Sequence, residues 1–204
     1  MTKYYSLLIA LLFLINVHIT SGQSGAFESI SAGAYMGSSF AGGDFLSSWD
    51  SEPGLHLEFR TPFYAGDLQA GARYARFSNS PDFPDYSDFD SFFIYMGWGY
   101  AFTIKDWISA GPGLRFGTTF FQYDEAKIYT RPNVGWEYDF DTNESEFAYE
   151  LLFRSNFRIS KHVSAHAELT YNRTLTFHPI IQNYITAGFT YTFGSPKWLK
   201  KVLR

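Results

Sequence analysis

A two-residue alternation of apolar and polar side chains recurs about eight times along the chain. The clearest example runs from Tyr184 to Phe193, where Ile185, Phe189 and Phe193 share one face and threonines occupy the other. Because the side chains of a β-strand point to alternate faces, each such segment predicts a strand with one apolar and one polar side. The strands are expected at residues 28–40, 54–63, 68–77, 91–103, 107–121, 147–159, 163–173 and 184–193.

Ionisable residues stand at alternate positions in several of these strands. In the strand expected at 54–63, His56, Glu58 and Arg60 share one face, and aliphatic and aromatic side chains occupy the other. The strand expected at 147–159 repeats the pattern. Together the polar faces predict an ionic network made of His56, Glu58, Arg60, Arg73, Arg115, Glu150, Arg154, Arg158, His166 and Glu168.

The composition of the two faces indicates which of them lines a barrel. A soluble carrier barrel needs an apolar lumen, whereas here the polar faces combine charges with glycines and the apolar faces are large and aromatic. Eight strands enclose a lumen just wide enough to be filled by side chains. We therefore expect an all-β fold, an eight-stranded antiparallel up-and-down transmembrane β-barrel. Its interior charges could form a proton or ion path, but the near balance of cations and acids favours a packed network of ion pairs.

The connections between the expected strands alternate in length. Short turns are expected at 64–67, 105–106 and 160–162, and long loops at 41–53, 78–90, 122–146 and 174–183. Outer-membrane barrels have short periplasmic turns and longer outer loops, so an even number of strands predicts that both termini are periplasmic. Two strand-like pieces within 122–146 predict a projecting hairpin, with a ten-stranded barrel as the alternative. Pro112 lacks an N–H group and predicts a bulge in its strand.

The first residues have the features of a secretory leader. Residues 1–22 contain Lys3, an apolar run from Leu7 to Val17 and small residues before a cleavage point, which predicts a signal peptide. The rest divides into a barrel at 23–194 and a basic periplasmic tail at 195–204. Cysteine is absent, which excludes disulfides and thiolate metal sites. Since only helices and closed barrels span lipid, we expect a barrel in the outer membrane of a Gram-negative bacterium.

Aromatic residues make up 21% of the chain, including 22 Phe and 15 Tyr. Outer-membrane barrels carry outward-facing girdles of aromatic side chains at both membrane interfaces. We expect such girdle positions, in contact with lipid and lipopolysaccharide, at Trp98, Trp107, Phe189, Tyr191 and Phe193.

The long loops are acidic. Segments 41–53, 78–90 and 122–146 hold 14 of the 20 Asp and Glu residues. They predict either a surface for divalent cations or a partner, or a solvated rim next to lipopolysaccharide, and the rim is the simpler interpretation. Asp139, Asp141 and Asn143 have the spacing of a calcium loop, but Glu144 stands where that loop requires glycine. No metal site and no cofactor are expected.

Two sets of residues are candidates for catalysis. Asp90-Ser91 with His178 loosely resembles the His/Asp/Ser set of the lipid A palmitoyltransferases, and His162 with Ser164 resembles the His-x-Ser of lipid A deacylases. The first enzymes need a hydrocarbon-lined lumen, whereas this lumen is charged, and the second pair lies at an expected periplasmic turn. We therefore do not expect an enzyme.

The segment 195–204 is basic and contains Trp198. It could form a short amphipathic helix that docks on the inner leaflet, on peptidoglycan or on a periplasmic partner, or it could be a terminus anchored by Trp198. No nucleic-acid partner is expected.

The runs Ala110–Gly117 and Phe189–Phe193 resemble the small outer-membrane barrels with an OmpA/OmpX-like architecture. The resemblance is to the outer membrane protein β-barrel domain and the PorT-like group of Bacteroidota. It implies insertion by the barrel-assembly machinery, which recognises an aromatic-ended final strand, here Phe189, Tyr191 and Phe193. For PorT-like members it implies an accessory role in a secretion system. The sequence thus leads to a non-enzymatic barrel that acts through its outer loops, with an accessory subunit, a lipid A enzyme and a small channel as alternatives.

Overall fold

The computed structural model describes residues 26–41, 49–80, 87–124, 128–130, 137–139, 143–176 and 179–202. The expected signal peptide at 1–22 lies outside these ranges, as does His178.

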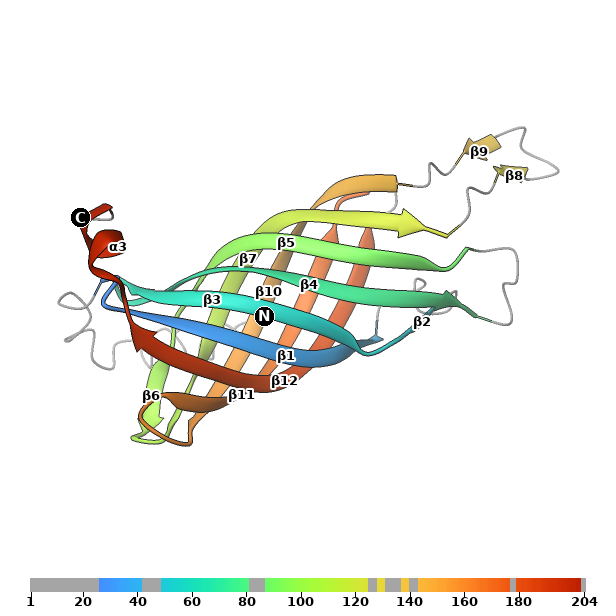
Figure 1. Ribbon diagram of the computed structural model, residues 1–204. Helices are drawn as coiled ribbons and strands as arrows, with labels where there is room; N and C mark the ends of the chain where they lie inside the picture. Colours follow the sequence, from blue (N-terminus) through green and yellow to red (C-terminus); the bar gives the residue numbers. More distant parts are fainter. Residues whose placement is uncertain are drawn as a thin grey trace, which may run out of the picture.

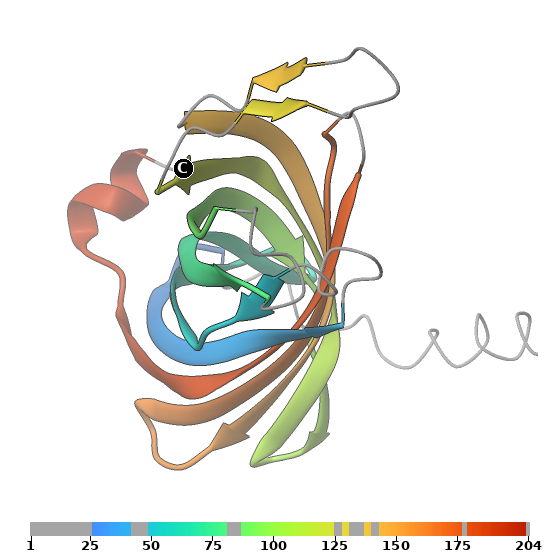
Figure 2. The ribbon, with the colours of Figure 1, turned by 90° about the vertical axis from the view of Figure 1, so that its right-hand side faces the viewer.

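Eight long strands form one closed antiparallel barrel, which confirms the expected fold (Figures 1 and 2). Each strand pairs with its neighbours along the barrel, and the pairings of β12 with β1 and of β7 with β10 complete the ring. Closure leaves no unpaired edge, which lipid would not tolerate. The strands are β1 (Ser29–Ala41), β3 (Gly54–Phe63), β4 (Gly66–Asn79), β5 (Phe89–Gly99), β7 (Ile108–Tyr123), β10 (Asn143–Arg158), β11 (Val163–Thr174) and β12 (Ile180–Gly194).

The two ends of the barrel differ in their connections. At one end, called here the short-turn end, the strands are joined at 64–65, 106–107 and 159–162. The long connections lie at the other, the long-loop end. The helix α3 (Lys197–Val202) follows β12 at the short-turn end (Figure 1). No helix in the described ranges has the length and apolar character required to cross a membrane.

Short strands extend the barrel at the long-loop end. The strand β2 (Trp49–Ser51) pairs with β4 beyond the end of β3. The strands β8 (Ile128–Thr130) and β9 (Glu137–Asp139) form a separate two-stranded sheet that projects outward (Figure 1). This agrees with the projecting hairpin and not with a ten-stranded barrel.

The prediction of a bulge at Pro112 is wrong. The register of β7 with β10 runs without a shift from Gln122 to Ile108, through Pro112. The interruption falls instead on the neighbouring strand, which splits into β5 and β6 (Phe102–Lys105) with Tyr100 in the break. Tyr100 N donates to Pro112 O at 2.9 Å, but proline has no N–H to return the bond. Pairing is therefore lost in the partner strand.

Candidate functional site

The lumen is lined by alternate residues of the eight strands, and the register places opposite charges directly across neighbouring strands. Glu150 of β10 is opposite Arg115 of β7, and Arg154 of β10 is opposite Glu168 of β11. Directly opposed side chains of antiparallel strands are close enough to interact. Strand pairing alone therefore brings two pairs of the expected ionic residues together.

Arg115 is the centre of this lumen network, and its side chain is fully buried. Its guanidinium contacts three carboxylates, Glu58 at 2.5 Å, Glu168 at 2.6 Å and Glu150 at 3.2 Å. Its Nε donates to Gln69 Oε1 at 3.1 Å. A charged side chain that is buried away from water is tolerated only when it is paired and hydrogen-bonded, and Arg115 meets both conditions.

Glu58 is the carboxylate shared by the largest number of guanidiniums. Besides Arg115, it contacts Arg154 at 2.9 Å and Arg60 at 3.2 Å. Arg154 also contacts Glu168 at 2.9 Å. The ion pairs thus form one cluster, in which each carboxylate contacts at least two guanidiniums.

Arg73 extends the lumen network toward the long-loop end. It contacts Glu150 at 2.5 Å, and its guanidinium carbon lies 3.7 Å from the centroid of the Tyr184 ring, a cation–π contact. With Arg60, Arg115 and Arg154, four guanidiniums then face the three carboxylates of the network.

The two histidines join the lumen network through hydrogen bonds. His56 Nε2 lies 2.5 Å from Tyr95 Oη, which itself donates to Glu58 at 2.8 Å. His166 Nδ1 lies 3.2 Å from Asn156 Oδ1, and its ring stacks on Tyr35. The structure therefore brings together nine of the ten expected ionic residues, namely His56, Glu58, Arg60, Arg73, Arg115, Glu150, Arg154, His166 and Glu168.

Arg158 is the exception and is corrected here. It is the last residue of β10, and its side chain is exposed rather than buried in the lumen network. The position falls at the open short-turn end, where water reaches the chain. Arg158 instead lines a cavity at that end.

Aromatic side chains inside the lumen were not expected from the sequence. At the long-loop end, Phe77, Phe89 and Phe121 pack together and are at most 2% exposed, and partly buried Trp49 and Tyr123 lie against them. The Phe77 and Phe89 rings stack with centroids 4.9 Å apart. This aromatic layer lies between the lumen network and the long loops.

Glycine placement is a sequence signal that could have revealed the lumen tyrosines. The Tyr35 ring lies over Gly33, so that a Cβ added at residue 33 would come within 3.0 Å of the hydroxyl oxygen and two ring carbons of Tyr35. Gly71 gives similar room to Tyr95, whose hydroxyl oxygen would be 2.5 Å from an added Cβ. A glycine beside a lumen-facing tyrosine thus marks the space that the ring occupies.

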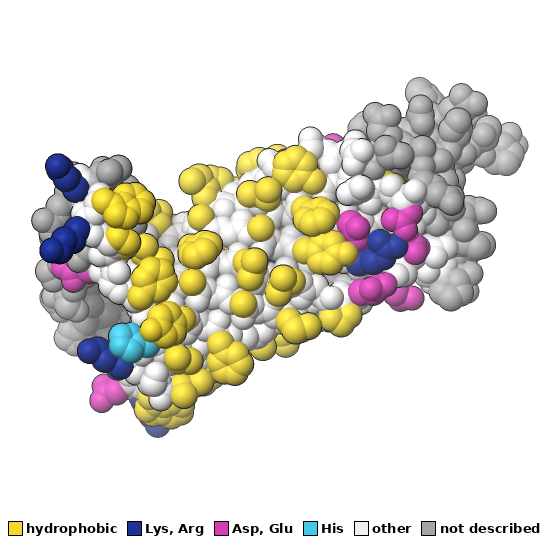
Figure 3. Space-filling view, viewed as in Figure 1, with side chains coloured by type: hydrophobic (Ala, Val, Ile, Leu, Met, Phe, Trp, Pro, Cys, Tyr) yellow, Lys and Arg dark blue, Asp and Glu magenta, His cyan; other side chains and the backbone are white. Residues whose placement is uncertain are grey.

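The outer wall carries the apolar faces of the strands. Large exposed apolar side chains, such as Leu57, Ile94 and Leu151, occur on β1, β3, β5, β7, β10, β11 and β12. Figure 3 shows apolar side chains spread over the wall between the two ends. Four expected girdle residues lie on this outer face with 37–63% of their surface exposed, namely Trp98, Phe189, Tyr191 and Phe193. The fifth, Trp107, is 52% exposed in the short turn before β7, where it also borders the cavity at that end.

An acidic rim lies on the outside of the long-loop end. Arg76 contacts Asp124 at 2.6 Å, Asp90 at 3.2 Å and Asp88 at 3.8 Å, and acidic side chains surround a basic one there in Figure 3. Tyr74 donates to Asp90 at 2.8 Å. Within the described ranges, no group of three or more His, Asp or Glu side chains is arranged to hold a metal ion.

The residues considered for catalysis are separated by the strand geometry. Ser91 is buried on the lumen side of β5, whereas Asp90 binds Arg76 and Tyr74 on the outer side. His162 stacks on the outward-facing Tyr191, whereas Ser164 lines the cavity at the short-turn end. Glu150, which stands eleven residues after Asp139 and so at the last ligand position of a calcium loop, instead contacts Arg73 and Arg115.

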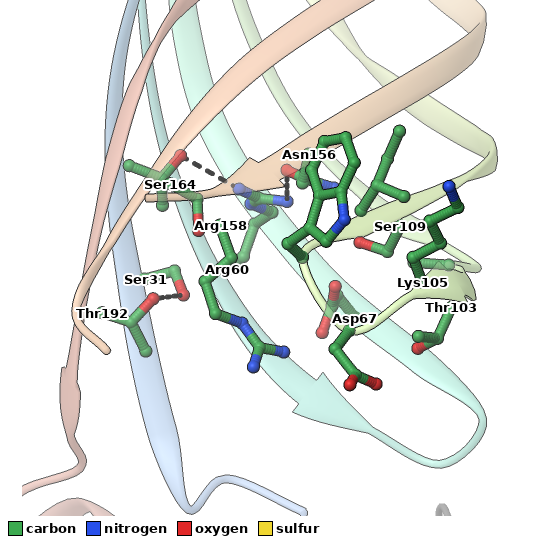
Figure 4. A pocket seen from close by; sticks show the side chains of 15 residues that line it. Ser31, Arg60, Asp67, Thr103, Lys105, Ser109, Asn156, Arg158, Ser164 and Thr192 are labelled. Carbon is green, nitrogen blue, oxygen red and sulfur yellow. Dashed lines mark hydrogen bonds between the residues drawn. The ribbon is translucent and has the colours of Figure 1, made fainter. Parts of the chain in front are cut away.

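That cavity has a volume of about 220 Å³ and opens at the short-turn end (Figure 4). Its charged lining residues are Arg60, Asp67, Lys105, Asp106 and Arg158. Arg60 belongs to the lumen network as well, so the cavity begins where the network ends.

No protein-family model and no curated protein sequence matches the chain. Among solved structures, Neisserial surface protein A matches with a TM-score of 0.59 and 12% identity, over 84% of this chain and 100% of that one. The fold is that of the outer-membrane β-barrels. Two other matches are the Yersinia pestis attachment invasion locus protein (TM-score 0.47, 16% identity, 83% and 99% covered) and OprG of Pseudomonas aeruginosa (TM-score 0.44, 11% identity, 85% and 99% covered).

Proposed function

We propose that the protein is an integral barrel of a Gram-negative outer membrane that acts through its exposed surfaces. The observation that carries this proposal is the reversal of polarity across the wall. Seven strands expose large apolar side chains to the outside, while the charged residues are buried in the lumen. Exposed apolar surface of this extent marks a membrane or protein contact. The short-turn end, where β1 begins and α3 follows β12, is then periplasmic.

The contents of the lumen support a barrel that neither conducts nor catalyses. The lumen network and the aromatic layer fill the interior in succession. A charged lumen gives no place for an acyl chain, and the catalytic candidates lie on opposite faces of the wall. The acidic rim and the long loops remain as the surfaces for contact with lipopolysaccharide or other cells.

The absence of cysteine allows a direct test of membrane placement and orientation. Ser80→Cys places a single thiol at the long-loop end, and Lys161→Cys places one at the short-turn end. An impermeant maleimide applied to intact cells should label the first variant, and the second only after the outer membrane is permeabilised. Both variants should also migrate faster on gels before boiling than after. Labelling of Lys161→Cys alone on intact cells, or no shift on boiling, would contradict the proposal.

A second candidate function is that of an accessory subunit of an envelope or secretion complex, as in the PorT-like group. The supporting observation is α3, which carries Trp198 with 67% of its surface exposed and the exposed Lys197 and Lys201. Extraction in mild detergent after crosslinking should then recover a stoichiometric partner from the full chain. A chain truncated after Ser195 is the control, and recovery of the barrel alone from both would exclude this role.

A further inference from the structure

The cavity at the short-turn end has a basic lining. Arg60, Lys105 and Arg158 contribute three positive charges, against Asp67 and Asp106. In Figure 4 the labelled charged side chains, Arg60, Asp67, Lys105 and Arg158, come from different strands and lie around one space. Neither Lys105 nor Arg158 forms an ion pair with a described acidic residue. A net positive charge around a small enclosed space favours an anion.

Arg60 connects this cavity to the lumen network and brings an incompletely balanced charge to it. It is only 8% exposed, and the carboxylate that it contacts, Glu58, is already shared with Arg115 and Arg154. Its Nε faces Glu58, and its two Nη groups donate to Asn156 at 3.4 Å and to Thr190 at 3.1 Å. The Nη partners are neutral, so an oxyanion in the cavity would offer this guanidinium a stronger, charged acceptor.

Neutral donors complete the lining. Six serine and threonine residues face the cavity together with Asn156. Asn156 Oδ1 already accepts from Arg60 at 3.4 Å and lies 3.2 Å from His166 Nδ1, which leaves the amide N–H groups of Asn156 to donate. Several hydroxyls and one amide beside two guanidiniums and an ammonium make a suitable set of donors for the oxygens of one oxyanion.

We propose that this cavity binds a phosphate group from the periplasmic side. Arginine matches phosphate oxygens with paired N–H donors, and lysine supplies a mobile point charge. Two guanidiniums and an ammonium offer donors from three directions, which suits the three terminal oxygens of a phosphate better than the two oxygens of a carboxylate. A volume of about 220 Å³ admits a phosphate with a small substituent and excludes a long chain. The phosphate belongs either to a soluble ester or to a lipid headgroup at the rim of the barrel.

The test is a titration of the full barrel in phosphatidylcholine nanodiscs with glycerol phosphate, followed by the fluorescence of Trp107, which also lines the cavity. We expect saturable binding that Arg158→Gln weakens about tenfold, the effect of one charge-assisted hydrogen bond. Lys161→Gln removes the same charge from an exposed turn outside the cavity and should leave the affinity unchanged. Trp198→Phe, which changes an exposed tryptophan outside the cavity, should leave both the affinity and the binding-induced change in fluorescence in place.

Three outcomes would overturn the proposal: no saturable binding, an equal loss of affinity in Lys161→Gln, or acetate binding as tightly as glycerol phosphate. The source of the phosphate is resolved by repeating the titration in phosphatidylglycerol nanodiscs. Weaker apparent affinity there indicates that lipid headgroups occupy the cavity. Unchanged affinity indicates a soluble phosphate ester.

Discussion

Arg115 shows how single residues stabilise the interior of this barrel. Its guanidinium lies within 3.2 Å of carboxylates from β3, β10 and β11. Removing one partner from a buried ion cluster is far more destabilising than the cluster is stabilising, because the remaining charges stay without water. A substitution at Arg115 therefore tests whether the lumen network stabilises the barrel.

Arg115→Gln should lower the free energy of unfolding by about 3–5 kcal/mol, since it leaves Glu58, Glu150 and Glu168 with one guanidinium fewer. The measurement is urea unfolding in lipid vesicles, followed by tryptophan fluorescence. Arg158→Gln is the matched control, the same change at an exposed arginine, and should cost less than about 0.5 kcal/mol. Equal losses in the two variants would show that the lumen network is not a stabilising element.

Gly33→Ala should destabilise the barrel by about 1–3 kcal/mol, because the added methyl group displaces the Tyr35 ring. The same substitution in a Tyr35→Leu background should cost much less, and the double-mutant cycle measures this coupling. Gly194→Ala is the control, since nothing lies within 4 Å of a Cβ at that position. A cost that is unchanged in the Tyr35→Leu background would contradict the assigned contact.

At the scale of the elements, the alternation of apolar and polar side chains correctly predicted the strands and which face of each strand lines the lumen. Leu57 and Glu58 lie on opposite sides of the wall as expected, since period two leaves only two choices for each strand. The lumen aromatics escaped prediction because β5 is apolar on both faces, with Phe93 inside and Ile94 outside. The sequence also could not predict which carboxylates Arg115 contacts, since this depends on how far the strands are staggered around the barrel.

Pro112→Ala restores a backbone N–H that can bond to Tyr100 and join β5 to β6. The regained hydrogen bond contributes about 1 kcal/mol, and the greater freedom of the unfolded chain offsets most of it. We therefore expect little change in stability but a strongly protected amide at residue 112 in hydrogen exchange. Rapid exchange at that amide would show that the break in β5 has another cause.

At the scale of the whole molecule, two unlike layers fill the barrel in series. The aromatic layer excludes ions from the long-loop end because it offers them no polar contact. The lumen network behind it is closely packed and internally paired. We expect each layer alone to block the lumen.

The protein should therefore give no conductance steps in planar bilayers. The double variant Phe89→Ala/Phe121→Ala opens only the aromatic layer and should also remain silent, because the lumen network still fills the barrel behind it. Heat-modifiable mobility on gels is the control that this variant has folded. Stepwise currents from it would show that the lumen network does not block ions.

The cavity and the aromatic layer together give the molecule the form of a cup rather than a tube. The cavity opens at the short-turn end, and Arg60, which lines it, contacts Glu58 of the lumen network. A cup exchanges its contents with one compartment alone. We therefore expect a solute that enters this cavity to leave by the same side, which would suit the barrel to retaining or sensing a solute rather than to passing one across the membrane.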